Sequence, residues 1–231
     1  MPPIPTITKN LMLACTAVLC LQWLFPVVST WFALFPLGSG SFMPWQVLSY
    51  GLLHGDLSHL LFNMLGLWMF GSELENLWGR NRYIQFIVVS VVSAAVVQLL
   101  VTYLMNSNVP TVGASGAIFG LLLAYALSFP RRQFDLVGFL PMLLIMVPSQ
   151  TLNLLGMVLY FMLMTNRQAV PIPPVYVRAQ VMVAIFGVIE LVLGLFFRGG
   201  VAHFAHLGGM VGGWLMMRWW RMRPPLGSRR R

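Results

Sequence analysis

The chain has 231 residues, a mean hydropathy of +0.81 and only 8% charged residues. Soluble globular domains carry about 25% charged residues, so these values exclude an ordinary soluble protein and indicate an integral membrane protein. The net charge of +9 does not indicate nucleic-acid binding, because the arginines lie between and after the apolar stretches instead of forming one basic face.

Six apolar stretches predict membrane-spanning helices, which need about 20 residues each. They lie at 11–29, 58–76, 83–104, 114–129, 179–197 and 203–220. The first contains Cys15 and Cys20, which predict neither a disulfide framework nor a metal site. It is long and lacks an A-x-A-like end, so we expect no cleaved signal peptide. The fourth is short and rich in Gly and Ala, so we expect it inside the bundle.

The basic residues predict the orientation of these spans. The loop at 30–57 and the connection at 105–113 contain no Lys or Arg, and Arg198 is the one basic residue expected on the outer side. By the positive-inside rule we expect six crossings with both termini in the cytoplasm. The residues assigned to the cytoplasmic side are Lys9, Arg80, Arg82, Arg131, Arg132, Arg167, Arg178, Arg218 and a basic tail at 221–231.

A further apolar stretch lies at 136–164, with arginines on both sides, so it cannot add one simple crossing. It is broken at Pro148-Ser149-Gln150-Thr151. Each half would form roughly 20 Å of helix, which is shorter than the ~30 Å of hydrocarbon in a bilayer. We expect a re-entrant or interfacial hairpin on the cytoplasmic side; a full two-crossing hairpin is the alternative.

Several polar side chains lie in or beside the apolar stretches: His54, Asp56, His59, Asn63, Ser115, Glu190, His203 and His206. Polar groups at membrane depth are candidates for function, and hydrogen bonding between helices is the alternative role. His59 and Asn63 are four residues apart and therefore share one helical face.

Small residues at four-residue spacing occur in "GASGAIFG" at 113–120 and in "LGGMVGG" at 207–213. Helices with this pattern pack with their backbones close together. Such packing would bring the Ser115 hydroxyl within hydrogen-bonding reach of His206, as a serine nucleophile requires.

Together with "HGDLSHLLFN" at 54–63, the motifs "GASGAIFG" and "AHLGGMVGG" at 205–213 resemble the rhomboid family of intramembrane serine proteases. The likeness to bacterial members covers about 42–132 and 170–217. It implies an all-α polytopic membrane protein, a six-helix rhomboid bundle, here with the extra hairpin between helices four and five. We expect one membrane domain over 1–231.

The resemblance implies that Ser115 is the nucleophile and His206 the general base, in a dyad for which we expect no third member. It implies that His59 and Asn63 stabilise the oxyanion, helped by the backbone N–H of Ser115. The supporting positions are Gly113, where the backbone passes close to the substrate, Phe119 against the imidazole, His54 as a structural or cavity-wall residue, and Gly116 and Gly209 as packing residues.

Two further residues have less defined expectations. Glu190 is either a buried hydrogen-bonded group or a family position of unknown role, and His203 is expected in the outer loop. We expect no cofactor and no metal.

The implied function is hydrolysis of peptide bonds in or near transmembrane helices of other membrane proteins, in a bacterial inner (plasma) membrane. The expected partners are these substrates and the lipid bilayer, and not nucleic acid. The alternative is a non-catalytic rhomboid-like protein that binds transmembrane clients. A polytopic transporter is more distant, because it would need paired charges at mid-membrane.

The chain departs from the bacterial family pattern between helices four and five. The segments "FPRR" at 129–132 and "PIPPVYV" at 171–177 resemble the two ends of a short loop, and about 133–170 is inserted between them. We expect this insertion on the side away from the catalytic cavity, where it is tolerated most easily.

Overall fold

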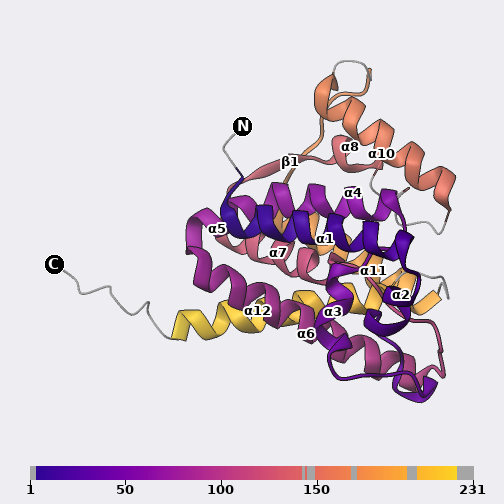
Figure 1. Ribbon diagram of the computed structural model, residues 1–231. Helices are drawn as coiled ribbons and strands as arrows, with labels where there is room; N and C mark the ends of the chain where they lie inside the picture. Colours follow the sequence, from indigo (N-terminus) through magenta and orange to yellow (C-terminus); the bar gives the residue numbers. More distant parts are fainter. Residues whose placement is uncertain (1–3, 142–143, 145–148, 168–170, 197–201, 223–231) are drawn as a thin grey trace.

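The computed structural model describes residues 4–141, 144, 149–167, 171–196 and 202–222, and the chain is mostly helical (Figure 1). The longer helices are α1 (Thr6–Leu24), α4 (Leu57–Gly66), α5 (Ser72–Trp78), α6 (Arg80–Leu104), α7 (Ser115–Ser128), α10 (Gln150–Thr165), α11 (Ala179–Phe196) and α12 (His203–Met222). The shorter elements are α2 (Val27–Phe32), α3 (Gln46–Ser49), α8 (Leu136–Phe139), 3-10 turns at Leu37–Ser39 and Tyr50–Leu52, a π-helical turn at Leu67–Gly71, and strands β1 (Gln133–Asp135) and β2 (Tyr176–Arg178).

Three helices in the described part of the chain, α1, α6 and α11, are long and apolar enough to cross a membrane. The helix α7 is apolar but shorter, at 14 residues. The helices α4 and α5 are joined by the π-helical turn, so helical backbone runs without a break from Leu57 to Trp78. Each predicted span therefore contains helix, while the number of crossings stays a prediction.

The predicted bounds agree with the helices except in the first stretch, which was placed at 11–29. The helix α1 begins directly after Pro5, its N-cap residue, and ends one residue before Phe25. Pro26 explains the early end, because a proline cannot donate the next helical hydrogen bond and disfavours helical geometry in the residue before it. Residue 197, at the end of the fifth predicted span, lies outside the described residues, as do Arg198 and most of the basic tail.

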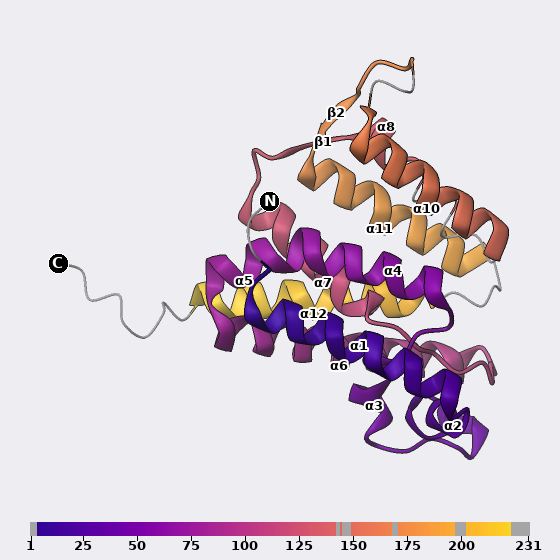
Figure 2. The same ribbon diagram turned by 45° about the horizontal axis from the view of Figure 1, so that its top comes forward.

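The helix α12 packs closely on both α6 and α7 (Figures 1 and 2). A Cβ atom added to Gly209 would run into the carbonyl oxygen of Gly116, and one added to Gly120 would lie 2.8 Å from the carbonyl oxygen of Gly209. On the side facing α6, a Cβ on Gly208 would lie 3.0 Å from the Cα of Ala94. The close approach predicted from the small residues is confirmed.

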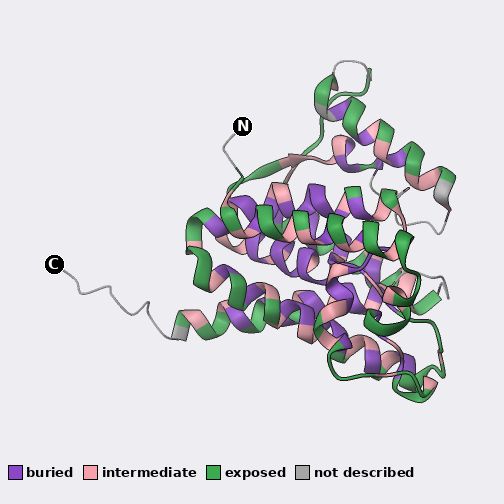
Figure 3. Cartoon of the chain, in the orientation of Figure 1, coloured by how far each residue is buried: buried purple, intermediate pink, exposed green. Residues whose placement is uncertain are grey.

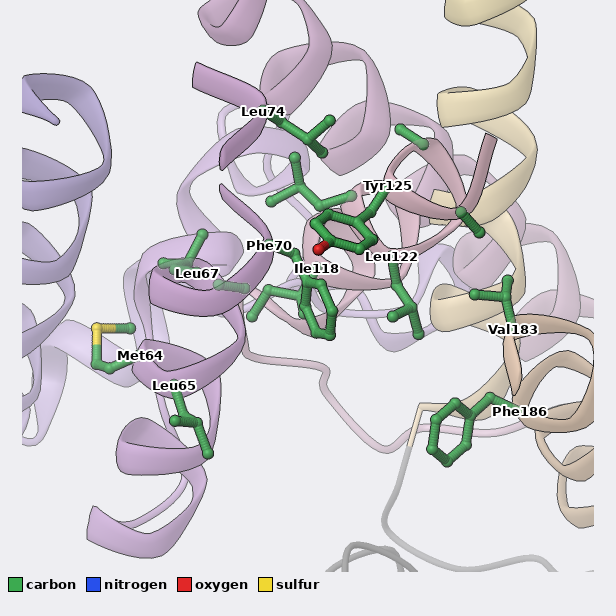
Figure 4. Close-up of a cluster of buried hydrophobic side chains, with 14 of the residues drawn as sticks. Met64, Leu65, Leu67, Phe70, Leu74, Ile118, Leu122, Tyr125, Val183 and Phe186 are labelled. Carbon is green, nitrogen blue, oxygen red and sulfur yellow. The ribbon is translucent and has the colours of Figure 1, made fainter. Parts of the chain in front are cut away.

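The helix α7 carries buried residues along most of its length (Figure 3). Figure 4 shows how its apolar side chains fill the space between the α4–α5 segment and α11. The labelled residues of this core are Met64, Leu65, Leu67, Phe70, Leu74, Ile118, Leu122, Tyr125, Val183 and Phe186. This packing holds the start of α7 at a fixed place beside α4 and α12.

A buried carboxylate fixes the first turn of α1. The side chain of Glu75 on α5 accepts hydrogen bonds from the N–H groups of Ile7 at 2.9 Å and Thr8 at 2.7 Å. The first N–H groups of a helix have no partner within it, so this carboxylate caps α1 and interacts favourably with its dipole. As a result α1 begins at the end of the bundle where α5 lies and where α12 ends (Figures 1 and 2).

The ends of the insertion are held together by a short antiparallel ladder, which the all-α expectation did not include. Strand β1 pairs with β2, with Gln133 opposite Arg178 and Asp135 opposite Tyr176. Asp135 also accepts a bond from the N–H of Val137 and forms an ion pair with Arg167. The chain therefore leaves the bundle and returns to it at one place.

Within the insertion, α10 contacts α4 along a face of residues at helical spacing. Buried Tyr160 donates to the sulfur of Met69, in the π-helical turn after α4, at 3.2 Å. Asn153, Gly156 and Leu163 occur on the same face of α10. Ser149 caps the helix, so the predicted break at 148–151 is confirmed for the described residues; Pro148 lies outside them.

Candidate active site

Ser115 and His206 lie in hydrogen-bonding contact. Ser115 is the first residue of α7 and His206 lies in the first turn of α12. The Ser115 Oγ is 2.8 Å from the His206 Nε2. The two residues meet because Gly116, directly after Ser115, and Gly209, one turn after His206, allow the two helix backbones to touch.

An aromatic ring fixes the plane of the imidazole. Phe119, one turn after Ser115, stacks on His206 with ring centroids 4.3 Å apart and planes inclined by 5°. Phenylalanine has no hydroxyl, so it restrains the ring through stacking alone. This is the arrangement predicted for Phe119.

The pair lies in a cavity of about 410 Å³. Its wall includes His59 and Asn63 from α4, Ser115 from α7, Glu190 from α11 and His206 from α12. A cavity of this volume is typical of sites for small ligands or side chains. The cavity therefore brings together residues from four helices that are far apart in the sequence.

His59 presents a ring N–H toward this cavity. Its Nδ1 accepts a hydrogen bond from the N–H of Gly55 at 3.3 Å, so Nε2 carries the proton in the neutral ring. A Cβ on Gly113 would lie 2.8 Å from the His59 Nε2 and 3.6 Å from the Ser115 Oγ. The His59 ring N–H and the Ser115 hydroxyl therefore both lie beside the backbone of Gly113. Gly113 has a φ of +125°, which other residues rarely adopt.

Asn63 and the backbone N–H of Ser115 are two more donors at this place. The Asn63 amide donates one hydrogen to the carbonyl of His59 at 2.8 Å and retains a second hydrogen. Ser115 is the first residue of its helix, where N–H groups have no partner within the helix. Asp56 caps α4 by accepting from the N–H of His59 at 2.8 Å, which fixes the start of the helix that carries both side chains.

His54 packs behind His59 and is held through its backbone. Its N–H and carbonyl both bond to the side-chain amide of Gln22, each at 3.0 Å. Its ring meets the ring of His59 edge to face, with centroids 5.1 Å apart. This contact agrees with the structural role that was one of the two expected for it.

Glu190 and His203 lie beside the dyad, for which we expected no third member. Glu190 is fully buried, and its Oε2 lies 2.7 Å from the His203 Nδ1 and 2.9 Å from the His206 Nδ1. His203 is not in a loop but is the first residue of α12, and it is buried. Two histidines three residues apart on one helical face, with a single acid on the preceding helix, were the sequence signal for this cluster.

These three side chains form the one group in the described residues whose ligand atoms lie close enough together to hold a metal ion. Tetrahedral ligands at ~2.1 Å from a zinc ion lie about 3.4 Å from one another. The two contacts of the carboxylate oxygen, at 2.7 and 2.9 Å, are shorter than that. The spacing therefore suits direct contact between the carboxylate and the two rings better than a shared ion.

The insertion also reaches this cavity, so the expectation that it lies on the far side is wrong. Phe139 of α8, Ser149, and Asn153 of α10 line the same space as Ser115 and His206. The reason is that α10 packs its buried face on α4 and on the π-helical turn that follows α4. Hydropathy cannot predict this placement, because it reports how apolar a helix is and not which neighbour covers it.

A model of the Rhomboid domain matches residues 41–160 of the chain, which include His59, Asn63 and Ser115, while His206 lies beyond the match. The rhomboid protease GluP of Bacillus subtilis is 33% identical over 92 residues, covering 39% of this chain and 17% of that protein. The putative rhomboid protease YdcA of the same organism is 32% identical over 95 residues, covering 41% and 45%.

The rhomboid protease GlpG of Pectobacterium atrosepticum is 33% identical over 92 residues, covering 39% of this chain and 32% of that protein. The matched segments thus span less than half the length of each of these relatives. The domain match, in contrast, extends over just more than half of the 231 residues. The chain therefore belongs to the rhomboid family of integral membrane proteins and is homologous to rhomboid serine proteases.

Proposed function

We infer that the chain is an intramembrane serine protease that hydrolyses peptide bonds in or near the transmembrane helices of other proteins. One observation carries this inference: the Ser115 Oγ lies 2.8 Å from the His206 Nε2 inside a cavity. A serine hydroxyl is a weak nucleophile unless a base is in contact with it, and this geometry supplies the base.

In the first half of the reaction, the Ser115 Oγ attacks the scissile carbonyl carbon while its proton moves to the His206 Nε2. The carbonyl oxygen becomes an oxyanion, and we assign its stabilisation to His59, Asn63 and the N–H of Ser115. The proton then passes from Nε2 to the leaving amine as the C–N bond breaks. Each preorganised donor in a water-poor site contributes about 3–4 kcal/mol to the lowering of the barrier.

In the second half, a water molecule attacks the acyl-enzyme and gives a proton to the His206 Nε2. The second tetrahedral intermediate collapses, the C–O bond to Ser115 breaks, and the proton returns to Oγ. The product leaves as a carboxylic acid and the free enzyme is restored. The proposed reaction uses no cofactor.

The apolar lining of the cavity supports a transmembrane segment as substrate. Phe62 of α4, Ile118 of α7 and Phe186 of α11 stand beside the polar groups. A helical carbonyl is hydrogen-bonded and hidden, so the substrate must unwind locally, and Gly or Pro in it would lower that cost.

For the whole molecule we propose six crossings with both termini in the cytoplasm, in a bacterial inner membrane. The insertion then forms an apolar hairpin that enters from the cytoplasmic side and reaches the depth of the cavity. Its contact with α4 and its place in the cavity wall support this arrangement.

The test is cleavage of a model single-span substrate in proteoliposomes. We expect the unmodified protein and Ser128→Ala, at the opposite end of α7, to cleave it, and Ser115→Ala to be inactive. Cleavage that persists in Ser115→Ala would refute the assigned nucleophile. If folded protein cleaves none of several substrates but still binds them, the client-binding alternative is favoured.

A further inference from the structure

The carboxylate of Glu190 occupies an unusual position for a charged group. It lies within α11, is fully buried, and faces the first turn of α12. Burying a carboxylate is costly unless partners compensate it. The two compensating groups are the Nδ1 atoms of His203 and His206, at 2.7 and 2.9 Å from the same oxygen.

The two contacts are not equivalent. The bond to His203 is well formed. The carboxylate is within hydrogen-bonding distance of the His206 Nδ1 but off the direction of its N–H, so that contact is mainly electrostatic here. Catalytic hydrogen bonds are often poorly aligned without substrate and tighten when it binds.

The tautomer of His206 decides whether it can act as a base. Its Nε2 faces the Ser115 Oγ and must be unprotonated to accept the serine proton. The neutral ring then carries its hydrogen on Nδ1, and a carboxylate beside Nδ1 favours that tautomer. When Nε2 takes the serine proton, the same carboxylate stabilises the imidazolium cation that results.

We propose that Glu190 is a positioning residue that holds His206 in the basic tautomer, and that His203 holds the carboxylate in place. The proposal rests on the proteolytic function proposed above and adds a third member to the pair of Ser115 and His206. His203 donates to Glu190 and thereby limits the rotation of the carboxylate.

The charged and titratable groups that act on His206 are few in the described part of the chain. They are Glu190 from α11, His203 from its own helix, and His59 from α4. Of these only Glu190 supplies negative charge. Removing that charge therefore leaves the imidazolium of His206 without a counter-charge among these groups.

The first variant is Glu190→Gln, which keeps the size of the side chain and removes its charge. We expect kcat to fall at least tenfold while KM changes less than twofold. The acidic limb of the kcat–pH profile should move to lower pH, because the imidazolium loses its counter-charge. Glu73→Gln, at an acid of α5 outside the site, is the matched control and should leave both quantities unchanged.

The second variant is His203→Leu, which removes the donor to Glu190 and tests the proposal even if Glu190→Gln does not fold. Without the His203 donor the carboxylate can rotate away from the His206 Nδ1, so kcat should fall and the acidic limb should move to lower pH, as in Glu190→Gln. Shifts of the pH profile in the same direction in both variants are not expected if the cluster only stabilises the fold. In that case thermal midpoints would fall while the pH profile stayed in place.

The outcomes separate this proposal from the proposed function. If the unmodified protein cleaves, Ser115→Ala does not, and Glu190→Gln keeps the unmodified kcat and pH profile, the positioning role is overturned. Loss of activity on chelation, with recovery on adding zinc, would overturn it in favour of a metal site. A fluorophosphonate probe should react with Ser115 if this serine is an activated nucleophile. If the probe does not label Ser115 in the unmodified protein and no substrate is cleaved, the proposed function fails and this proposal fails with it.

Discussion

Replacing Gly209 by alanine tests whether the close packing of α7 and α12 creates the contact between serine and histidine. The added Cβ would overlap the Gly116 carbonyl oxygen and lie 2.5 Å from its carbonyl carbon. Carbon atoms pack at ~3.5–4.0 Å, so the helices must separate by roughly 1 Å. His206 moves with Gly209, because the two are three residues apart on one helix, and its 2.8 Å contact with the Ser115 Oγ is broken.

A displacement of about 1 Å costs about a hundredfold in rate, or about 2.7 kcal/mol at 1.36 kcal/mol per tenfold. We therefore expect kcat/KM for a single-span substrate in proteoliposomes to fall about a hundredfold in Gly209→Ala. Gly187→Ala is the matched control, because its Cβ would meet only the flexible end of Met210 at 3.4 Å. Unmodified kcat/KM in a folded Gly209→Ala protein would refute the reasoning.

Three further predictions concern other parts of the molecule. Gly113→Ala should lower kcat by about 10²–10³-fold, because alanine disfavours the φ of +125° and its Cβ would lie 2.8 Å from the His59 Nε2. Steady-state kinetics of protein expressed at the unmodified level measure this change, and an unaltered kcat would contradict the prediction. Tyr160→Ala removes a buried ring from the contact of the insertion with the π-helical turn after α4 and should cost on the order of 3 kcal/mol. Limited proteolysis should then cut α10 earlier than the bundle, whereas an unchanged pattern would show that this contact does not hold the helix. Burial raises the pKa of Asp135, but its bonds with Arg167 and the backbone outweigh this and hold the pKa below the ordinary value. The stabilisation by ionised Asp135 is therefore complete above the unfolded pKa of about 3.9 and is lost as pH falls through the folded pKa. The difference in thermal midpoint between the unmodified protein and Asp135→Asn should be constant from neutral pH down to about pH 5 and shrink below about pH 4, and a difference that grows on acidification would reverse the assigned sign.

Much of the site could be predicted from the sequence because its parts have local signals. The four-residue spacing of His59 and Asn63 places them on one face of α4, and both line the cavity. The glycine pattern predicted the close packing, and from it the contact of Ser115 with His206. Each of these inferences needs only helical geometry and the size of a side chain.

The position of Glu190 could not be predicted in the same way. A lone acid in an apolar helix indicates that a partner exists, but the partner depends on the rotation of α11 about its axis. That rotation is set by packing of residues such as Met182 and Phe186 against the core, which no local pattern specifies. The neighbour of α10 was missed for the same reason.

The two ends of the insertion are joined where the bundle helices stop and start, and this junction fixes the start of α11, the helix that carries Glu190. The N–H of Ala179, the first residue of α11, donates to the carbonyl of Arg132 at 2.9 Å. The start of α11 at Ala179 therefore lies next to Arg132, where the insertion begins, as it would if a short loop joined the two. The ladder of β1 with β2 and the ion pair of Asp135 with Arg167 close this junction. Changes in the length of the insertion beyond the junction should leave the start of α11 in place, whereas changes at the junction itself would move Glu190 relative to His206.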